Sequence, residues 1–221
     1  MRAILFDAFG TLFKVTSGGS AKTIMKNITD FGIVLDEKAF LEEWKSYYKK
    51  HASDDYIFMT ERDIFISRIQ MFYDRYHVKR NAENDADSLL ATAFAREAYP
   101  ETKDVLHDLM ENYLVFIGSN TDNDVLECVM QNNNVTVHKV YTSENLKCYK
   151  PTSRFFTQIL DDNGLSPNEV LFVGDSITDD IQGPKAIGIK TVWIDRDGVG
   201  GDFGQDYTIT NLNELINGIL R

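Results

Sequence analysis

Short apolar runs alternate with stretches of helical spacing along the second half of the chain. Apolar runs typical of buried strands lie at 113–117, 139–141, 170–173, 191–194 and, more weakly, 207–210. Helical spacing is seen between them, at about 102–111 and 123–131, from Pro151 onward, and at 178–187 and 212–220. Strands that alternate with helices of this length pair in parallel, so the pattern predicts an α/β doubly wound sheet.

The first part of the chain has a different texture. Residues 3–6 and 9–13 are apolar and strand-like, with Asp7 and Gly10 interrupting them. From about Ser20 to Arg96 the spacing is helical, with Asp36 as a good N-cap for an aromatic helix. We therefore expect a core of residues 1–15 and 97–221, and an inserted α-helical cap over residues 16–96.

Composition and charge narrow the range of partners. The chain has 221 residues and a formal net charge of −11, and it shows no basic patch of the kind that a nucleic-acid-binding protein carries. Its two cysteines, Cys128 and Cys148, cannot build a disulfide framework and form no CxxC pair. No apolar run approaches the roughly 18 residues of a membrane span, and the N-terminus lacks the spacing of a signal peptide. We expect a cytoplasmic protein that binds neither membrane nor nucleic acid.

In open parallel sheets, ligands bind beyond the carboxyl ends of the strands, so the residues there are the functional candidates. The first strand is followed by Asp7-Ala8-Phe9-Gly10-Thr11-Leu12, and the strand at 113–117 by Gly118-Ser119-Asn120. Lys150 precedes Pro151 and its helix, and Gly174-Asp175-Ser176-Ile177-Thr178-Asp179-Asp180 follows the strand at 170–173. Each segment alone is ordinary, but all four at strand ends form a coherent set.

This set can carry out nucleophilic chemistry on an anion. Asp7 is a candidate nucleophile at a strand end. Asp175 is a second carboxylate, and two such charges about 4 Å apart repel by about 4 kcal/mol at an effective dielectric near 20. A divalent cation between them removes the conflict, and oxygen ligands suit Mg²⁺. Ser119 can donate a hydrogen bond to an oxyanion, and Lys150 can balance the developing charge.

Together, these motifs resemble the haloacid dehalogenase-like hydrolase superfamily, over essentially the whole chain. The resemblance implies a Rossmann-like core and a covalent aspartyl-enzyme intermediate. It also implies a magnesium site made of Asp7, the Phe9 carbonyl and Asp175. Asp180 would orient a metal-bound water or Lys150, with Asp179 the weaker candidate. The predicted catalytic residues are Asp7, Thr11, Ser119, Asn120, Lys150 and Asp180.

Position 9 departs from the phosphatase pattern of that superfamily. Its phosphatases usually carry an aspartate there, which protonates the leaving group and later activates water. Phe9 can do neither, and a positioned acid–base group is typically worth about 10²–10⁴-fold in rate. We therefore expect slow hydrolysis of alkyl phosphates and a smaller deficit on aryl or acyl phosphates, whose leaving groups are stable anions.

The first and last motifs favour different branches. The segment from Phe6 to Phe13 is more like the 2-haloacid dehalogenases, in which halide leaves without a proton. Those enzymes carry a Trp-Arg pair in the cap, where this chain has Trp44-Lys45, and lysine does not replace arginine's planar fork. They also favour a tyrosine after the active-site lysine, where Phe155 and Phe156 stand, and lack a metal-binding aspartate at position 175.

We give Asp175 more weight, because an extra carboxylate beside Asp7 is costly without a cation. The first hypothesis is a Mg²⁺-dependent phosphatase acting on a small phosphorylated metabolite through an aspartyl-phosphate at Asp7. The alternatives are a metal-independent 2-haloacid dehalogenase and a non-catalytic binding protein on the same scaffold. A phosphonatase-like use of Lys45, Lys49 or Lys50 is a further possibility, although these side chains read more simply as a solvated helical face.

Overall fold

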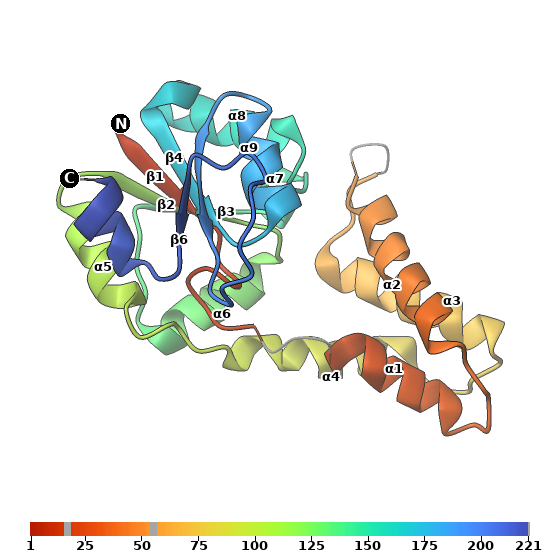
Figure 1. Ribbon diagram of the computed structural model, residues 1–221. Helices are drawn as coiled ribbons and strands as arrows, with labels where there is room; N and C mark the ends of the chain where they lie inside the picture. Colours follow the sequence, from red (N-terminus) through yellow and green to blue (C-terminus); the bar gives the residue numbers. More distant parts are fainter. Residues whose placement is uncertain (16–18, 54–56, 221) are drawn as a thin grey trace. The chain divides into compact units, whose positions relative to one another are not determined.

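Apolar strands from residues 1–15 and 96–221 form one parallel sheet. The computed structural model describes residues 1–15, 19–53 and 57–220. The strands are β1 (Ala3–Phe6), β2 (Leu114–Ser119), β3 (Lys139–Thr142), β4 (Val170–Gly174), β5 (Lys190–Ile194) and β6 (Tyr207–Ile209). They pair in parallel in the order β3-β2-β1-β4-β5-β6 (Figure 1). The predicted α/β Rossmann-like parallel sheet is confirmed.

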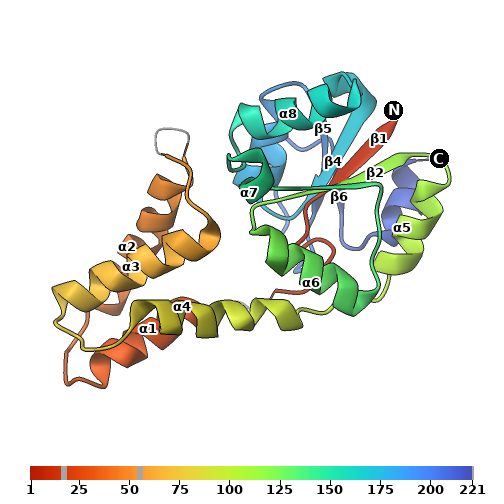
Figure 2. The ribbon, with the colours of Figure 1, turned by 180° about the vertical axis from the view of Figure 1, so that it is seen from behind.

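Both faces of this sheet are covered, as the near-continuous apolar strands require. Ile4 and Phe6 of β1 face a core shared with α5 (Thr102–Met110), α6 (Asn123–Asn133) and η4 (Leu215–Ile219). Ala3 and Leu5 face a second core, formed with α7 (Ser143–Leu146) and α8 (Ser153–Asn163). Figure 2 shows α5 and α6 on the face turned toward the viewer. Burial of each large apolar side chain contributes about 1.5–3 kcal/mol.

The strand order places β1 between β2 and β4, so that its carboxyl end lies in the middle of the sheet edge where ligands bind. From β1 the chain fills one side of the sheet with β2 and β3, and the other side with β4, β5 and β6. Phe6, the last residue of β1, pairs with Ile117 of β2 and Val173 of β4. The segments that follow these three strands therefore emerge side by side, at the switch point where open α/β sheets bind ligands.

The chain divides into two compact units, Met1–Val15 with Arg96–Arg221, and Thr16–Ala95. The second unit contains α1 (Gly19–Thr29), α2 (Glu37–His51), α3 (Glu61–Arg75), α4 (Ala82–Ala91) and the short η1 (Ala93–Ala95). Asp36 caps α2 as predicted, its side chain accepting from the N–H of Ala39 at 3.0 Å. Phe40 and Trp44 of α2 are buried against Phe72 of α3. Within the described residues, no helix combines the length and apolarity needed to cross a membrane.

The predicted strand at 9–13 is wrong. This segment forms a tight turn in which the N–H groups of Leu12 and Phe13 both donate to the Ala8 carbonyl, at 2.8 and 2.9 Å. The turn depends on Gly10, whose φ of +96° is a conformation that residues with a side chain rarely adopt. The apolar side chains of this segment pack into the core from a loop rather than from a strand.

Two predicted helices differ in form. The helix expected at 178–187 is a π-helical segment, η3 (Ile177–Gln182), followed by the short helix α9 (Gly183–Lys185). Pro184 lacks a backbone N–H and cannot continue the hydrogen-bond pattern of η3. The C-terminal helix expected at 212–220 is the shorter π-helical segment η4. The remaining sheet-covering elements, η2 (Pro167–Glu169) among them, lie between the strands as the alternating pattern predicts.

Candidate active site

The carboxylates of three strand-end segments lie together. Asp7 follows β1, Asp175 follows β4, and Asp180 lies on η3 just beyond Asp175. One carboxylate oxygen from each lies within 4.8 Å of the other two. The Asp7 backbone is fixed to the sheet, because its N–H donates to the Val173 carbonyl at 2.9 Å. Residues separated by 173 positions in the chain thus form one acidic group.

Lys150 is buried between two of these carboxylates. Its Nζ lies 2.7 Å from Asp7 Oδ1 and 2.7 Å from Asp180 Oδ1. Burial alone would lower the pKa of Lys150, but the charges of Asp180 and Asp7 outweigh it and raise that pKa. The lysine is therefore a fixed cation, unsuited to giving up its proton near neutral pH.

Asp180 binds the buried Lys150. Its Oδ1 accepts from Lys150, while its Oδ2 accepts from the Ser176 N–H at 2.9 Å. Burial raises the pKa of the Asp180 carboxyl, and the charge of Lys150 works against that shift. A β-carbon added at Gly174 would lie 2.4 Å from Asp180 atoms, so the end of β4 needs glycine to admit this side chain. Asp179 contributes its backbone N–H to Ser176 Oγ, at 3.3 Å.

Ser119 and Asn120 reach the site from β2. Ser119 Oγ donates to Asp7 Oδ1 at 3.2 Å. Asn120 instead holds the backbone of Lys150 on both sides, since its Nδ2 donates to the Lys150 carbonyl at 3.0 Å and its Oδ1 accepts the Lys150 N–H at 2.8 Å. The structure thus places Ser119 against the candidate nucleophile and Asn120 as a brace for the segment that carries the lysine.

Asp175 is the carboxylate with the fewest protein partners. Thr11 Oγ1 donates to its Oδ1 at 3.3 Å, and Trp193 Nε1 donates to its backbone carbonyl at 3.1 Å. The crowding of protein atoms around it and the charge of Asp7 raise the pKa of the Asp175 carboxyl to about 7, although its side chain keeps access to solvent. A β-carbon at Gly10 would lie 2.3 Å from Asp175 Oδ2, so that glycine makes room for the carboxylate.

The charges of this group fit a divalent cation. Three carboxylates and one ammonium leave a formal charge of −2 in a confined volume, which is costly without a counterion. The donors are carboxylate oxygens, which Mg²⁺ prefers, and the exposed Asp175 leaves room for water. The carboxylates of Asp7 and Asp175 therefore fit their part in the predicted magnesium site, and the Phe9 carbonyl stays a prediction.

Phe9 is half-buried. Its ring lies 6.1 Å from that of Phe13 and 4.0 Å from the Arg96 guanidinium carbon, measured to the ring centroid. It also contacts the core under β1. An aspartate placed here with the same direction would lie near Arg96 and Phe13.

Among the cap residues that the sequence singled out, Trp44 is a core residue of its own unit. It packs with Phe40 and Phe72, and the Arg68 guanidinium carbon lies 3.6 Å from its ring centroid. Lys45 and Lys49 are exposed on α2. Arg68, which no sequence pattern points to, is 3% exposed and donates to the Trp44 carbonyl at 2.9 Å.

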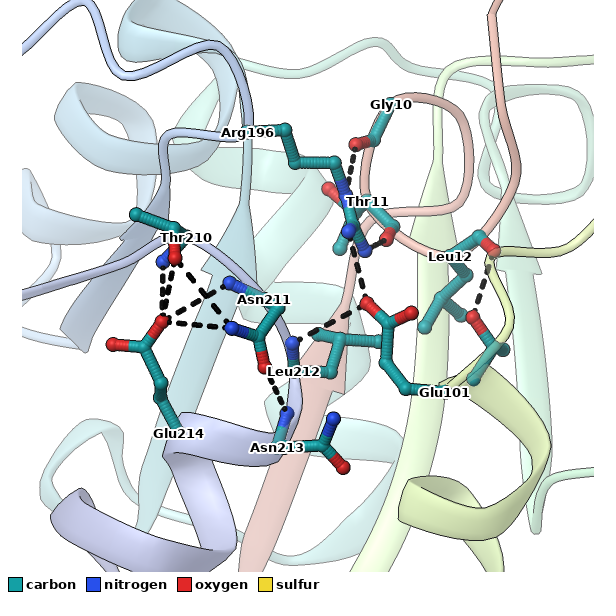
Figure 3. Close-up of polar contacts among 11 residues, drawn as sticks. Gly10, Thr11, Leu12, Glu101, Arg196, Thr210, Asn211, Leu212, Asn213 and Glu214 are labelled. Carbon is teal, nitrogen blue, oxygen red and sulfur yellow. Dashed lines mark hydrogen bonds and ion pairs between the residues drawn. The ribbon is translucent and has the colours of Figure 1, made fainter.

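Sequence reasoning also missed Arg196, which lies two residues beyond β5. Its guanidinium binds the loop that carries the candidate nucleophile, through the carbonyls of Gly10 and Thr11 (Figure 3). The signal that could have found it is position, because Asp195-Arg196 follows a parallel strand at the same edge of the sheet as Asp7. Asp195 itself closes its own loop, by accepting the N–H groups of Val199 and Gly200.

The sequence model for the haloacid dehalogenase-like hydrolases matches residues 1–188. The chain belongs to this hydrolase family. It is 27% identical over 208 residues to (S)-2-haloacid dehalogenase 4A of Burkholderia cepacia, covering 90% of this chain and 84% of that protein.

Two further proteins resemble this chain, one in sequence and one in fold. A glyceraldehyde 3-phosphate phosphatase of Methanocaldococcus jannaschii is 37% identical over 81 residues, covering 35% of this chain and 36% of that protein. The solved HAD-hydrolase YfnB from Bacillus subtilis, bound to magnesium, has a TM-score of 0.77 at 18% identity and covers 100% of this chain and 99% of its own. That last likeness establishes the shared fold.

Proposed function

We propose that this hydrolase is a Mg²⁺-dependent phosphatase that acts on a small phosphorylated molecule through a covalent intermediate at Asp7. The observation that carries the proposal is Asp175, an exposed carboxylate held within 4.8 Å of Asp7 and Asp180 while the buried Lys150 is already shared by those two. A reaction that needed no cation would be hindered by this third negative charge, whereas a metal-dependent one requires it.

In this reaction Asp7 attacks phosphorus, so that an O–P bond to the carboxylate forms as the bond to the leaving oxygen breaks. Lys150 and Ser119 both bind Asp7 Oδ1, which fixes the carboxylate, and the described residues offer no hydrogen bond to Oδ2. Asp180 keeps Lys150 charged and in place. When bound by Asp7, Asp175 and the Phe9 carbonyl, Mg²⁺ would neutralise the excess negative charge and polarise the phosphoryl group.

The missing acid at position 9 defines the substrates. With Phe9 turned toward Phe13 and Arg96, no protein carboxyl at that position protonates a leaving oxygen. Turnover then depends on a leaving group that is stable as an anion, so aryl and acyl phosphates should react faster than alkyl phosphates.

The second candidate is a metal-independent 2-haloacid dehalogenase. It is favoured by Phe9, which suits a leaving group that needs no proton, and by the alignment with the Burkholderia dehalogenase over most of the chain. In that reaction Asp7 would displace halide from carbon, and Asp175 would be left without a role.

The two candidates separate in one pair of assays on the wild-type protein. Phosphate release from p-nitrophenyl phosphate and chloride release from 2-chloropropionate are measured side by side, each with Mg²⁺ and with a chelator. The proposal expects phosphate release that the chelator abolishes. Chloride release that is indifferent to the chelator, without phosphate release, would establish the dehalogenase instead. Loss of both activities in an Asp7→Asn variant ties either reaction to the nucleophile.

A further inference from the structure

The turn that follows β1 is held from outside by hydrogen bonds to three consecutive carbonyl groups. The Leu12 carbonyl accepts from the Tyr99 N–H at 3.0 Å and from Thr102 Oγ1 at 2.9 Å. The carbonyls of Gly10 and Thr11 accept from the guanidinium of Arg196, at 3.2 Å from Nε and 2.6 Å from Nη2 (Figure 3). Among the described residues, Arg196 provides the side-chain donors to these two carbonyls.

Arg196 is itself fixed on two further sides. Its Nη1 lies 2.9 Å from Glu101 Oε1, and its guanidinium carbon lies 3.3 Å from the centroid of the Tyr99 ring. The Glu101 carboxylate also accepts the Leu212 N–H at 3.5 Å. A planar guanidinium with donors at fixed angles can satisfy this whole arrangement, whereas the single ammonium of lysine cannot.

Arg196 holds the position of the turn and adds little net charge to its surroundings. Glu101 neutralises Arg196, and burial of that carboxyl is more than offset by its hydrogen bonds, those from Arg196 included, so that the Glu101 pKa is lowered and the pair stays ionised. The two carbonyls held by Arg196 flank the parts of the turn that face the acidic site. Gly10 packs against Asp175, and Thr11 donates to Asp175 through its hydroxyl.

We infer that Arg196 is a positioning residue for the reaction at Asp7. By holding the carbonyls of Gly10 and Thr11, it fixes the turn that presents the Thr11 hydroxyl and the Gly10 backbone to Asp175. The inference rests on the proposed function for its catalytic consequence, and on the geometry of the turn alone for its structural one.

The experiment compares Arg196→Lys and Arg196→Met with the wild-type protein in two measurements. The first is the kcat and KM of metal-dependent p-nitrophenyl phosphate hydrolysis. The second is hydrogen exchange of the Leu12 and Phe13 amides, which bond to the Ala8 carbonyl inside the turn. Small displacements of reacting groups cost up to about 10²-fold in rate, so we expect kcat to fall by about 10–10²-fold with KM little changed. Lysine, which keeps the charge, should resemble methionine more than arginine.

Two control variants separate positioning from general damage. Arg2→Lys changes an exposed arginine paired with Glu169 at 3.2 Å, and should leave both measurements unchanged. Val129→Ala truncates a buried side chain on α6, and should lower the melting temperature without faster exchange confined to the turn. Arg196→Lys should show faster exchange confined to the turn, even if its melting temperature is no lower than that of Val129→Ala.

The outcomes decide the inference separately from the proposed function. Faster exchange of the turn together with a lower kcat in Arg196→Lys supports it. Wild-type kcat, or wild-type exchange of the Leu12 and Phe13 amides, in both Arg196 variants overturns it. If the wild-type protein releases no phosphate with Mg²⁺, the proposed function fails and exchange alone decides whether Arg196 holds the turn.

Discussion

Replacing Asp175 by asparagine should have opposite effects on stability with and without metal. In the presence of a chelator, the change removes the repulsion between Asp175 and the neighbouring Asp7. At the largest separation allowed by the site, 4.8 Å, two unit charges repel by about 3.5 kcal/mol at an effective dielectric of 20. Solvent access to Asp175 screens part of this, leaving about 1–2 kcal/mol.

The sign follows from the pKa of this group. The folded protein raises the pKa of Asp175 to about 7, above the ordinary aspartate value, so the folded state holds the proton more tightly than the unfolded state does. Ionisation of Asp175 therefore costs stability, and the cost grows as pH rises toward 7 and is complete above it. Asp175→Asn should remove that cost at pH 8.

The assay is thermal unfolding of the wild-type protein and the variant at pH 8, in chelator and in Mg²⁺. In chelator, a gain of 1–2 kcal/mol corresponds to a rise of roughly 2–8 °C in melting temperature for a chain of this size. In Mg²⁺ at about 100 times its Kd, the wild-type protein should gain about 2.7 kcal/mol, and the variant should gain almost nothing.

Asp108→Asn is the matched control, because it makes the same chemical change at an exposed carboxylate of α5. It should leave both the chelator and the Mg²⁺ values close to those of the wild-type protein. A variant Asp175→Asn that is no more stable than wild type in chelator, and that gains as much from Mg²⁺, would refute both the repulsion and the metal site.

Three other predictions follow from the same contacts. Lys150→Met should abolish turnover and lower the free energy of unfolding by about 3–5 kcal/mol in urea titrations, because it leaves Asp7 and Asp180 buried without their cation; a loss below about 1 kcal/mol would contradict this. The stabilisation by Mg²⁺ should weaken as pH falls below the Asp175 pKa of about 7, since protons compete for that carboxylate, and a melting-temperature gain that is flat from pH 5 to 8 would refute it. Phe9→Asp should improve alkyl-phosphate hydrolysis by less than about 10-fold, well short of the usual general-acid effect, because the side chain packs toward Phe13 and Arg96; a selective gain of 10²-fold in kcat on an alkyl phosphate would show that the new carboxyl reaches the leaving group.

The sequence predicts those parts of this protein that depend on the spacing of apolar residues and on the position of a residue at a strand end. Buried parallel strands are continuous apolar runs, so β1, β2, β4 and β5 were readable, and parallel pairing brings their ends to one edge. The sequence therefore predicts that Asp7, Ser119 and Asp175 lie together. The same edge also brings Lys150 near Asp180. The sequence does not reveal that Lys150 forms ion pairs with both Asp7 and Asp180.

The parts that sequence could not predict depend on backbone groups or on the direction of one side chain. The turn at 9–13 has the apolar pattern of a strand because its side chains pack into the core. A single glycine, Gly10, reverses the chain there, and one glycine in a sequence does not predict a turn. Arg196 binds carbonyl oxygens as far as 186 residues away in the sequence, and carbonyls leave no mark on a side-chain pattern. The role of Asn120 as a brace for the Lys150 backbone is hidden for the same reason.

The most direct test of the central claim is to capture the phosphorylated Asp7. Because Phe9 cannot activate water, the aspartyl-phosphate should break down slowly and accumulate during turnover of an aryl phosphate. The wild-type protein is mixed with p-nitrophenyl phosphate and Mg²⁺, quenched in acid and digested, and the peptide that contains Asp7 is weighed. We expect the mass of one phosphoryl group on Asp7, absent in chelator and in Asp175→Asn. An unmodified Asp7 under these conditions, in a protein that releases chloride from 2-chloropropionate without metal, would contradict the account.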